Sequence, residues 1–235
     1  MEKITTNRQT VLLNSKAHYK VLDGLRGVAA ISVVVFHFME FAVPDYNNSF
    51  IAHGYLAVDF FFCLSGFVIA YAYGSRMKDL GVLQFFKLRL IRLQPLVFVG
   101  AVLGLLTFLF DPFHNLFAAN GPVKTMLMFL SAGLMIPYPS IPERYYNLFY
   151  INPPTWSLFW EYIANIFYAV LLWKMNIHLH RILTVLAALL LFYTAFYYNN
   201  LSIGWGADNY AGGGARVLFS FLAGMLLFLF RMTKT

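Results

Sequence analysis

Apolar and polar residues alternate along this chain in long blocks. Six apolar stretches are each close to the roughly 20 residues that a helix needs to cross a bilayer, and polar segments with prolines and glycines separate them. These stretches lie at about residues 21–43, 55–74, 95–113, 156–173, 182–199 and 214–231. The pattern predicts an all-α fold, a polytopic membrane bundle of about six transmembrane helices that forms a single domain over residues 1–235.

Two further segments do not fit a simple span. Residues 81–93 (GVLQFFKLRLIRL) mix large apolar side chains with basic ones, among them Arg89 and Arg92, which is typical of an amphipathic helix on the inner membrane surface. Pro95 marks the predicted boundary between this segment and the third span. Residues 122–137 are apolar but short, which favours a re-entrant or interfacial segment.

The composition supports a membrane protein. Hydrophobic residues make up 60% of the chain and charged residues only 11%, whereas a soluble domain is usually about 25% charged. The net charge of +7 is read first as a topology signal rather than as a nucleic-acid signal, so we expect a lipid bilayer and no nucleic acid as partner. Cys63 is the one cysteine and excludes an internal disulfide.

Lysine and arginine are distributed unequally between the two sides. With six spans, one side holds 13 of these residues and the other holds 2. The basic side consists of segments 1–20, 75–92, 174–181 and 231–235. Because basic loops stay in the cytoplasm, we expect a multi-pass protein of the cell (inner) membrane with both termini in the cytoplasm.

The first span carries ionisable residues that lipid alone would not tolerate. Arg26 and His37 are 11 residues apart, close to three whole helical turns, so they share one face about 16 Å apart along the axis. Asp23 precedes Arg26 by three residues and can pair with it. Intramembrane ionisable residues usually have a function, although Asp23 and Arg26 could also anchor the helix at the inner headgroups.

The second span carries candidate supporting residues. Asp59 lies in its outer half, and Ser65 and Gly66 lie near its middle. Gly66 permits close approach by the backbone of another helix or by a substrate, and helix packing is the commoner reason for such a pair.

The fourth span places three polar residues on one face. Glu161, Asn165 and Tyr168 follow the spacing i, i+4 and i+7. By its depth Glu161 could meet His37, and a carboxylate beside an imidazole would fix the tautomer that a general base requires. His178 and His180 are a weak metal signal in a basic loop, so we expect surface histidines and no metal site.

These residues, in this order, resemble the membrane-bound acyltransferase family 3, which includes O-acetylases of bacterial surface polysaccharides. The most specific match is LDGLRG followed by an arginine-to-histidine spacing of 11, and V-D-x-F-F-x-x-S-G-F is nearly as specific. The matching pieces are YKVLDGLRGVAAISVVVFHF (19–38), GYLAVDFFFCLSGFVIAY (54–71), FFKLRLIRLQP (85–95), PPTWSLFWEYIANIFY (153–168) and ARVLFSFLAGMLLF (215–228).

The resemblance implies an enzyme that takes an acyl group, usually acetyl, from cytoplasmic acyl-CoA as donor substrate, with no permanently bound cofactor. The acceptor would be a hydroxyl of a glycan or of another molecule, as in O-acetylation of a polysaccharide. His37 would be catalytic, the matching Arg26 essential, and the pair Arg89 and Arg92 would lie on the acyl-CoA side.

The resemblance also implies that the W-S-L-x-x-E segment belongs to the functional core. In this chain it contributes Trp156 and Ser157 besides Glu161. Many members read W-S-L-S-x-E-E-Q-F-Y, and this chain departs from that pattern on both sides of Glu161, so the acceptor class does not carry over. Family members commonly have more spans, so we expect the chain to be incomplete at its C-terminus.

Two other functions compete with acyl transfer. A transporter or flippase of a lipid or glycan could use the same charged stripe, but the inverted repeats or paired broken spans of such proteins are not found in the sequence. A structural remnant without activity would tolerate the replacement of His37 by alanine.

Overall fold

The computed structural model describes residues 19–232, except for 44, 46–47, 140 and 143–145. In this part of the chain the secondary structure is helical, with one isolated bridge between Asn147 and Gly206, so the predicted all-α fold is confirmed. The α-helices are α2 (Lys20–Ala42), α3 (Ala57–Tyr73), α4 (Met77–Leu109), α5 (Leu116–Leu134), α6 (Thr155–Val170), α7 (Ile177–Tyr198) and α8 (Tyr210–Met232). Two short 3₁₀ helices are η2 (Gly54–Leu56) and η4 (Leu172–Lys174).

Five of these helical segments are long and apolar enough to cross a membrane: α2, η2 with α3, α4, α7 and α8. The chain is therefore an integral membrane protein with several spans. The predicted fourth span appears as α6, which has only 16 residues and is about 24 Å long. It falls short of the roughly 30 Å of a bilayer core, so the structure supports five spans by length where the hydropathy pattern predicts six.

The predicted boundary at Pro95 is wrong. The helix α4 runs for 33 residues with Pro95 in its interior, and its one residue with non-helical backbone angles is Gly81, at φ +71°. Residues 82–109 thus form one helix, and the predicted amphipathic segment continues directly into the third span. A proline ends a helix only when the lost backbone hydrogen bond is not tolerated, and membrane helices tolerate it often.

The second apolar segment of uncertain type is also helical. In α5, Gly121 at φ +72° interrupts the helix, and Pro122–Leu134 follow as 13 helical residues, about 20 Å long. This length is too short for a straight span. Its re-entrant or interfacial position stays a prediction.

The chain divides into two compact units, Met1–Ala57 and Val58–Thr235. In the first unit, η2 returns onto α2: Phe36 is buried, and a Cβ on Gly54 would stand 2.6 Å from the Cβ of Phe36. The rings of Tyr55 and Phe36 pack edge-on, with 6.0 Å between their centres. Glycine at 54 is therefore what allows the turn to close against the helix.

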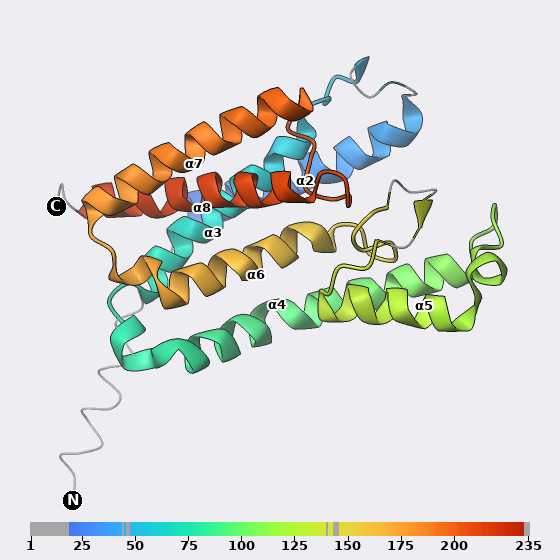
Figure 1. Cartoon of the computed structure of the whole chain (residues 1–235), viewed down its shortest axis with the longest axis horizontal. Coiled ribbons are helices and arrows are strands. Elements are labelled where there is room, and N and C mark those ends of the chain that lie inside the picture. Colours follow the sequence, from blue (N-terminus) through green and yellow to red (C-terminus); the bar gives the residue numbers. More distant parts are fainter. Residues whose placement is uncertain (1–18, 44, 46–47, 140, 143–145, 233–235) are drawn as a thin grey trace, which may run out of the picture. The chain divides into compact units, whose positions relative to one another are not determined.

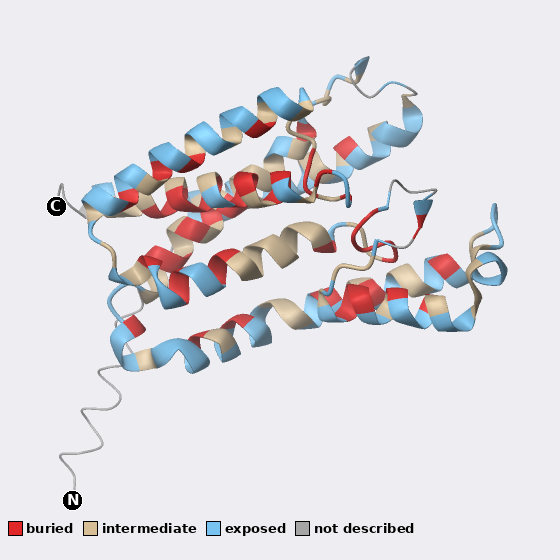
Figure 2. Ribbon diagram, viewed as in Figure 1, coloured by how far each residue is buried: buried red, intermediate tan, exposed pale blue. Residues whose placement is uncertain are grey.

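The second unit has its main core around α8. This helix packs against both α7 and α6 (Figure 1), and half of its membrane-length segment is buried (Figure 2). Its backbone meets that of α3 at two glycines, because a Cβ on Gly66 would clash with the carbonyl of Phe221 and one on Gly224 with the carbonyl of Cys63. The predicted close approach at Gly66 is confirmed, and its partner is a helix.

A second core lies where α4 and α5 run side by side (Figure 1). Its buried members include Ala101, Phe108, Met128 and Ala132. Much of both helices is exposed (pale blue in Figure 2), and the exposed residues include many leucines, valines and phenylalanines, as on a surface in contact with lipid.

Candidate functional site

The first unit carries the predicted catalytic helix. The helix α2 is continuous from Lys20 to Ala42, so Arg26 and His37 share one face as predicted. Arg26 forms an ion pair with Asp23, with 3.2 Å between its Nη1 and the carboxylate Oδ1, and both side chains are about two-fifths exposed. The predicted pairing of these two residues is confirmed.

His37 has a carboxylate partner on its own helix. Its Nδ1 lies 2.6 Å from Oε2 of Glu40, one turn further along α2. An ionised carboxylate can only accept a hydrogen bond, so in the neutral imidazole this contact favours the tautomer with the proton on Nδ1 and a lone pair on Nε2. The side chain of His37 is 54% exposed.

The sequence analysis did not single out Glu40. The signal was present, since Glu40 follows His37 at the i+3 spacing that brings side chains of one helix together. The expectation that Glu161 serves this histidine stays a prediction, and the contacts of Glu161 in the structure are with other residues.

Glu161 joins three helices of the second unit. Its Oε1 accepts a hydrogen bond from the hydroxyl of Ser65 on α3 at 2.8 Å and another from Nη2 of Arg89 on α4 at 2.6 Å. The side chain of Arg89 is only 3% exposed and that of Glu161 15%. The hydroxyl of Ser65 thus helps to hold the carboxylate of Glu161 in place, and the supporting role of Ser65 stays a prediction.

The two arginines of the predicted pair have different surroundings. Arg89 is buried against Glu161, whereas Arg92, one turn further along α4, is exposed. The location of Arg89 at an accessible inner surface is therefore wrong. Arg89 is buried because it pairs with the carboxylate of Glu161 on α6, and the periodicity of α4 alone does not reveal this partner.

The face of α6 that points into the second unit carries several buried polar side chains. Asn165 is completely buried and Tyr168 is 1% exposed, so the predicted common face of these residues with Glu161 points into the unit. Among the described residues, the carboxamide of Asn165, the hydroxyls of Tyr162 and Tyr168 and Nε of Arg89 have no hydrogen-bond partner. Buried polar groups without protein partners are rare, which marks this face as a polar strip inside the bundle.

A second buried ion pair joins α3 to α8. Nε of Arg216 lies 3.2 Å from each carboxylate oxygen of Asp59, and Nη2 lies 2.7 Å from Oδ2. Nη1 donates to the carbonyl of Ile203 at 2.8 Å, and the guanidinium stands 5.2 Å from the ring centre of Trp156. The side chain of Arg216 is 1% exposed, and its contacts hold Asp59, Trp156 and the backbone at Ile203 together.

Arg216 was missed by the sequence analysis, although an arginine within the last apolar stretch is the signal that was used for Arg26.

The other two predicted residues of the W-S-L-x-x-E segment, Trp156 and Ser157, contact other parts of the second unit. Trp156 meets Phe62 edge-on at 6.4 Å, and the hydroxyl of Ser157 donates to the carbonyl of Pro154 at 3.0 Å in the first turn of α6.

The described residues contain no group of three histidine, cysteine, aspartate or glutamate side chains that could hold a metal ion. His178 is exposed as expected, but the expectation of a surface position is wrong for His180, which is 2% exposed in the first turn of α7. Its Nδ1 lies 3.1 Å from the carbonyl of Asn176.

These features define a helical membrane protein with an imidazole–carboxylate pair in one unit and two buried arginine–carboxylate pairs in the other. The family model of the acyltransferase domain matches residues 19–235, nearly the whole chain. The chain belongs to this family, acyltransferase family 3, and is therefore an enzyme that transfers acyl groups.

The chain is also similar to two known bacterial proteins. The chain is 36% identical over 162 residues to "Protein 2 in picA locus" of Rhizobium radiobacter, an alignment that covers 63% of this chain and 80% of the relative. It is 32% identical over 143 residues to the O-acetyltransferase OatA of Staphylococcus aureus, covering 58% of this chain and 22% of the relative. The chain thus aligns with about a fifth of the length of OatA. No solved structure matches the chain.

Proposed function

We propose that this membrane acyltransferase is an O-acyltransferase, with acetyl as the acyl group, acyl-CoA as the donor and a hydroxyl of a glycan as the acceptor. The observation that carries the proposal is the contact of 2.6 Å between His37 and Glu40. A histidine whose Nδ1 is held by a carboxylate presents Nε2 as a general base, and transfer to an alcohol needs such a base. The similarity to a protein named an O-acetyltransferase supports acetyl as the group that is moved.

The reaction follows from these groups. Nε2 of His37 takes the proton from the hydroxyl of the glycan while the hydroxyl oxygen attacks the thioester carbonyl of acyl-CoA. The carbon–sulfur bond breaks, and the imidazolium returns its proton to the departing thiolate. The products are an ester and the free thiol of CoA, so no oxidant or other co-reactant is needed. Glu40 stabilises the transient imidazolium.

The donor requires cations for its phosphates. We propose that Arg92, which is exposed, contacts acyl-CoA from the cytoplasmic side, and that Arg26 adds positive charge nearer the inner surface on the face of His37. Arg89 acts on the donor only indirectly, by fixing the helix that carries Arg92, since its guanidinium is already paired with Glu161.

Release of free CoA thiol from acetyl-CoA by membranes that contain the protein tests the proposal, together with mass spectrometry of acetyl esters on the surface glycans of the cells. His37→Gln keeps the approximate size of the side chain but cannot act as a base, so both signals should fall at least 10²-fold at matched protein levels. His178→Gln, at an exposed histidine outside the site, is the control and should retain both signals. Glycans that stay acetylated in cells with His37→Gln would contradict the assignment.

A further inference from the structure

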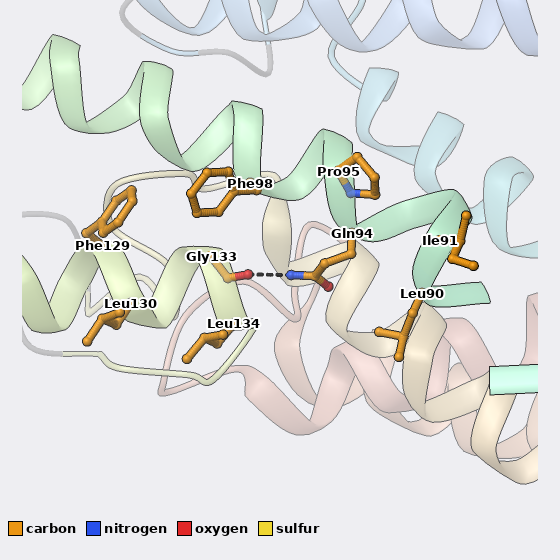
Figure 3. A pocket seen from close by; sticks show the side chains of 9 residues that line it. All are labelled: Leu90, Ile91, Gln94, Pro95, Phe98, Phe129, Leu130, Gly133 and Leu134. Carbon is orange, nitrogen blue, oxygen red and sulfur yellow. Dashed lines mark hydrogen bonds between the residues drawn. The ribbon is translucent and has the colours of Figure 1, made fainter. Parts of the chain in front are cut away.

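A groove lies between α4 and α5 in the second unit (Figure 3). Its volume is about 650 Å³, within the range of about 300–1,000 Å³ that small-molecule sites show. One wall carries Leu90, Ile91 and Phe98 from α4, and the other carries Leu130 and Leu134 from α5. All five side chains are more than two-fifths exposed, so the groove opens to the surroundings of the helices.

The groove has a defined floor and a closed end. The side-chain amide of Gln94 donates across the helix pair to the carbonyl of Gly133 at 2.5 Å, which links the two helices at the centre of the groove (Figure 3). At one end the rings of Phe98 and Phe129 meet edge-on at 6.0 Å. What remains is an apolar channel, and its lining suits a hydrocarbon chain.

A cation lies on α4 one helical turn before Ile91, beyond the other end of the groove lining. Lys87, Ile91, Gln94 and Phe98 follow the spacing i, i+4, i+7 and i+11, so they form one stripe along α4 about 16 Å long. Lys87 is exposed, and the described residues give it no carboxylate partner. The stripe therefore runs from a positive charge along an apolar channel to a closed aromatic end.

We propose that this groove is a binding site for one anionic phospholipid, with an acyl chain in the channel and the phosphate at Lys87. The charge distribution selects this ligand: the exposed Lys87 is the positive charge at one end of the stripe, and an amphiphile with a negative headgroup and an apolar tail matches both ends of the stripe. The lining is exposed beside α4, which is long and apolar enough to cross a membrane, so a lipid would reach the groove by lateral diffusion. The site is separate from the proposed acyl transfer and does not depend on it.

Native mass spectrometry of the full chain in a nonionic detergent tests the site with two added lipids, phosphatidylglycerol and phosphatidylcholine, that have the same acyl chains. We expect tighter binding of phosphatidylglycerol. Lys87→Gln should weaken its binding about fivefold and leave phosphatidylcholine unchanged, because one basic side chain near an anionic headgroup accounts for about that factor. Leu130→Trp should weaken the binding of both lipids, because the indole fills the channel.

Two matched variants control for general effects. Lys78 is also exposed on α4 but precedes the non-helical Gly81, so Lys78→Gln should leave the lipid preference intact. Leu127 is 44% exposed on α5, against 43% for Leu130, but does not line the groove, so Leu127→Trp should bind as the unaltered protein does. Equal binding of the two lipids, or equal losses in Lys78→Gln and Lys87→Gln, would overturn the proposal. Displacement of the lipid by a lower concentration of long-chain acyl-CoA would also overturn it and make the groove a donor site.

Discussion

At the scale of single residues, two arginines of the second unit each pair with one carboxylate inside the bundle. Arg89 with Glu161 and Arg216 with Asp59 are each short, well-oriented pairs with an almost completely buried guanidinium. Taking such charges out of water is costly, and each pair offsets that cost only while both members are present. These residues therefore affect stability before they affect chemistry.

Breaking the first pair should destabilise the protein. Arg89→Met leaves Glu161 without its guanidinium and should lower the free energy of unfolding by about 3–5 kcal/mol, whereas the double variant Arg89→Met with Glu161→Met should lose less than either single one. Thermal unfolding in detergent measures this. An Arg89→Met protein as stable as the unaltered one would show that the pair is not needed.

The neighbouring arginine should behave differently. Arg92→Gln removes an exposed charge, so we expect unfolding within about 0.5 kcal/mol of the unaltered protein. If Arg92 contacts the phosphates of acyl-CoA, the variant should raise KM for acyl-CoA several-fold with little change in kcat. A KM that does not move would leave Arg92 with a role in topology alone.

At the scale of helices, the contact of α3 with α8 depends on two glycines. Gly66→Leu would push the helices apart, because even a Cβ there meets the carbonyl of Phe221. We expect loss of folded protein in membranes, measured as the monodisperse fraction after detergent extraction. Gly133→Ala is the control, since a Cβ there would stand 3.7 Å from the ring of Phe98, an ordinary contact. Equal yields would mean that the close approach is not required.

The hydropathy pattern predicts most of the helices, but not all of their boundaries or their contacts with one another. The predicted first span, 21–43, agrees with Lys20–Ala42 within one residue, because its ends coincide with the change from apolar to polar side chains. At Pro95 the same reasoning fails, because the proline is accommodated within one long helix. The hydropathy pattern also does not predict which helices contact each other. Arg216 and Asp59 are 157 residues apart in the sequence, and only the packing of α8 on α3 brings them together.

The candidate site was predictable in part. The spacing of Arg26 and His37 places them on one face, and the helix confirms it. Glu40 was missed because the search for a partner of His37 looked to another helix, whereas the partner lies one turn away on the same helix. The polar strip of Asn165 and Tyr168 was visible as a helical face, but its burial follows from the packing of α6.

At the scale of the whole molecule, the inequality of 13 to 2 basic residues, which holds when α6 crosses the membrane as the sixth span, sets the expected orientation. In a background with Cys63→Ala, single cysteines at Ser75 and His178 should be protected from an impermeant thiol reagent added to intact cells. Cysteines at His114 and Ala207 should react with it. Labelling of His178→Cys from outside would reverse the orientation of α7.

The central claim concerns how the molecule performs acyl transfer, namely that His37, oriented by Glu40, is the base. A double-mutant cycle of His37→Gln and Glu40→Gln, with release of CoA thiol measured at matched protein levels, tests it most directly. His37→Gln should lose at least 10²-fold in activity, Glu40→Gln should lose less, and the double variant should be no worse than His37→Gln, because Glu40 acts only through the imidazole. Losses that multiply in the double variant, or near-normal activity in His37→Gln, would contradict this mechanism.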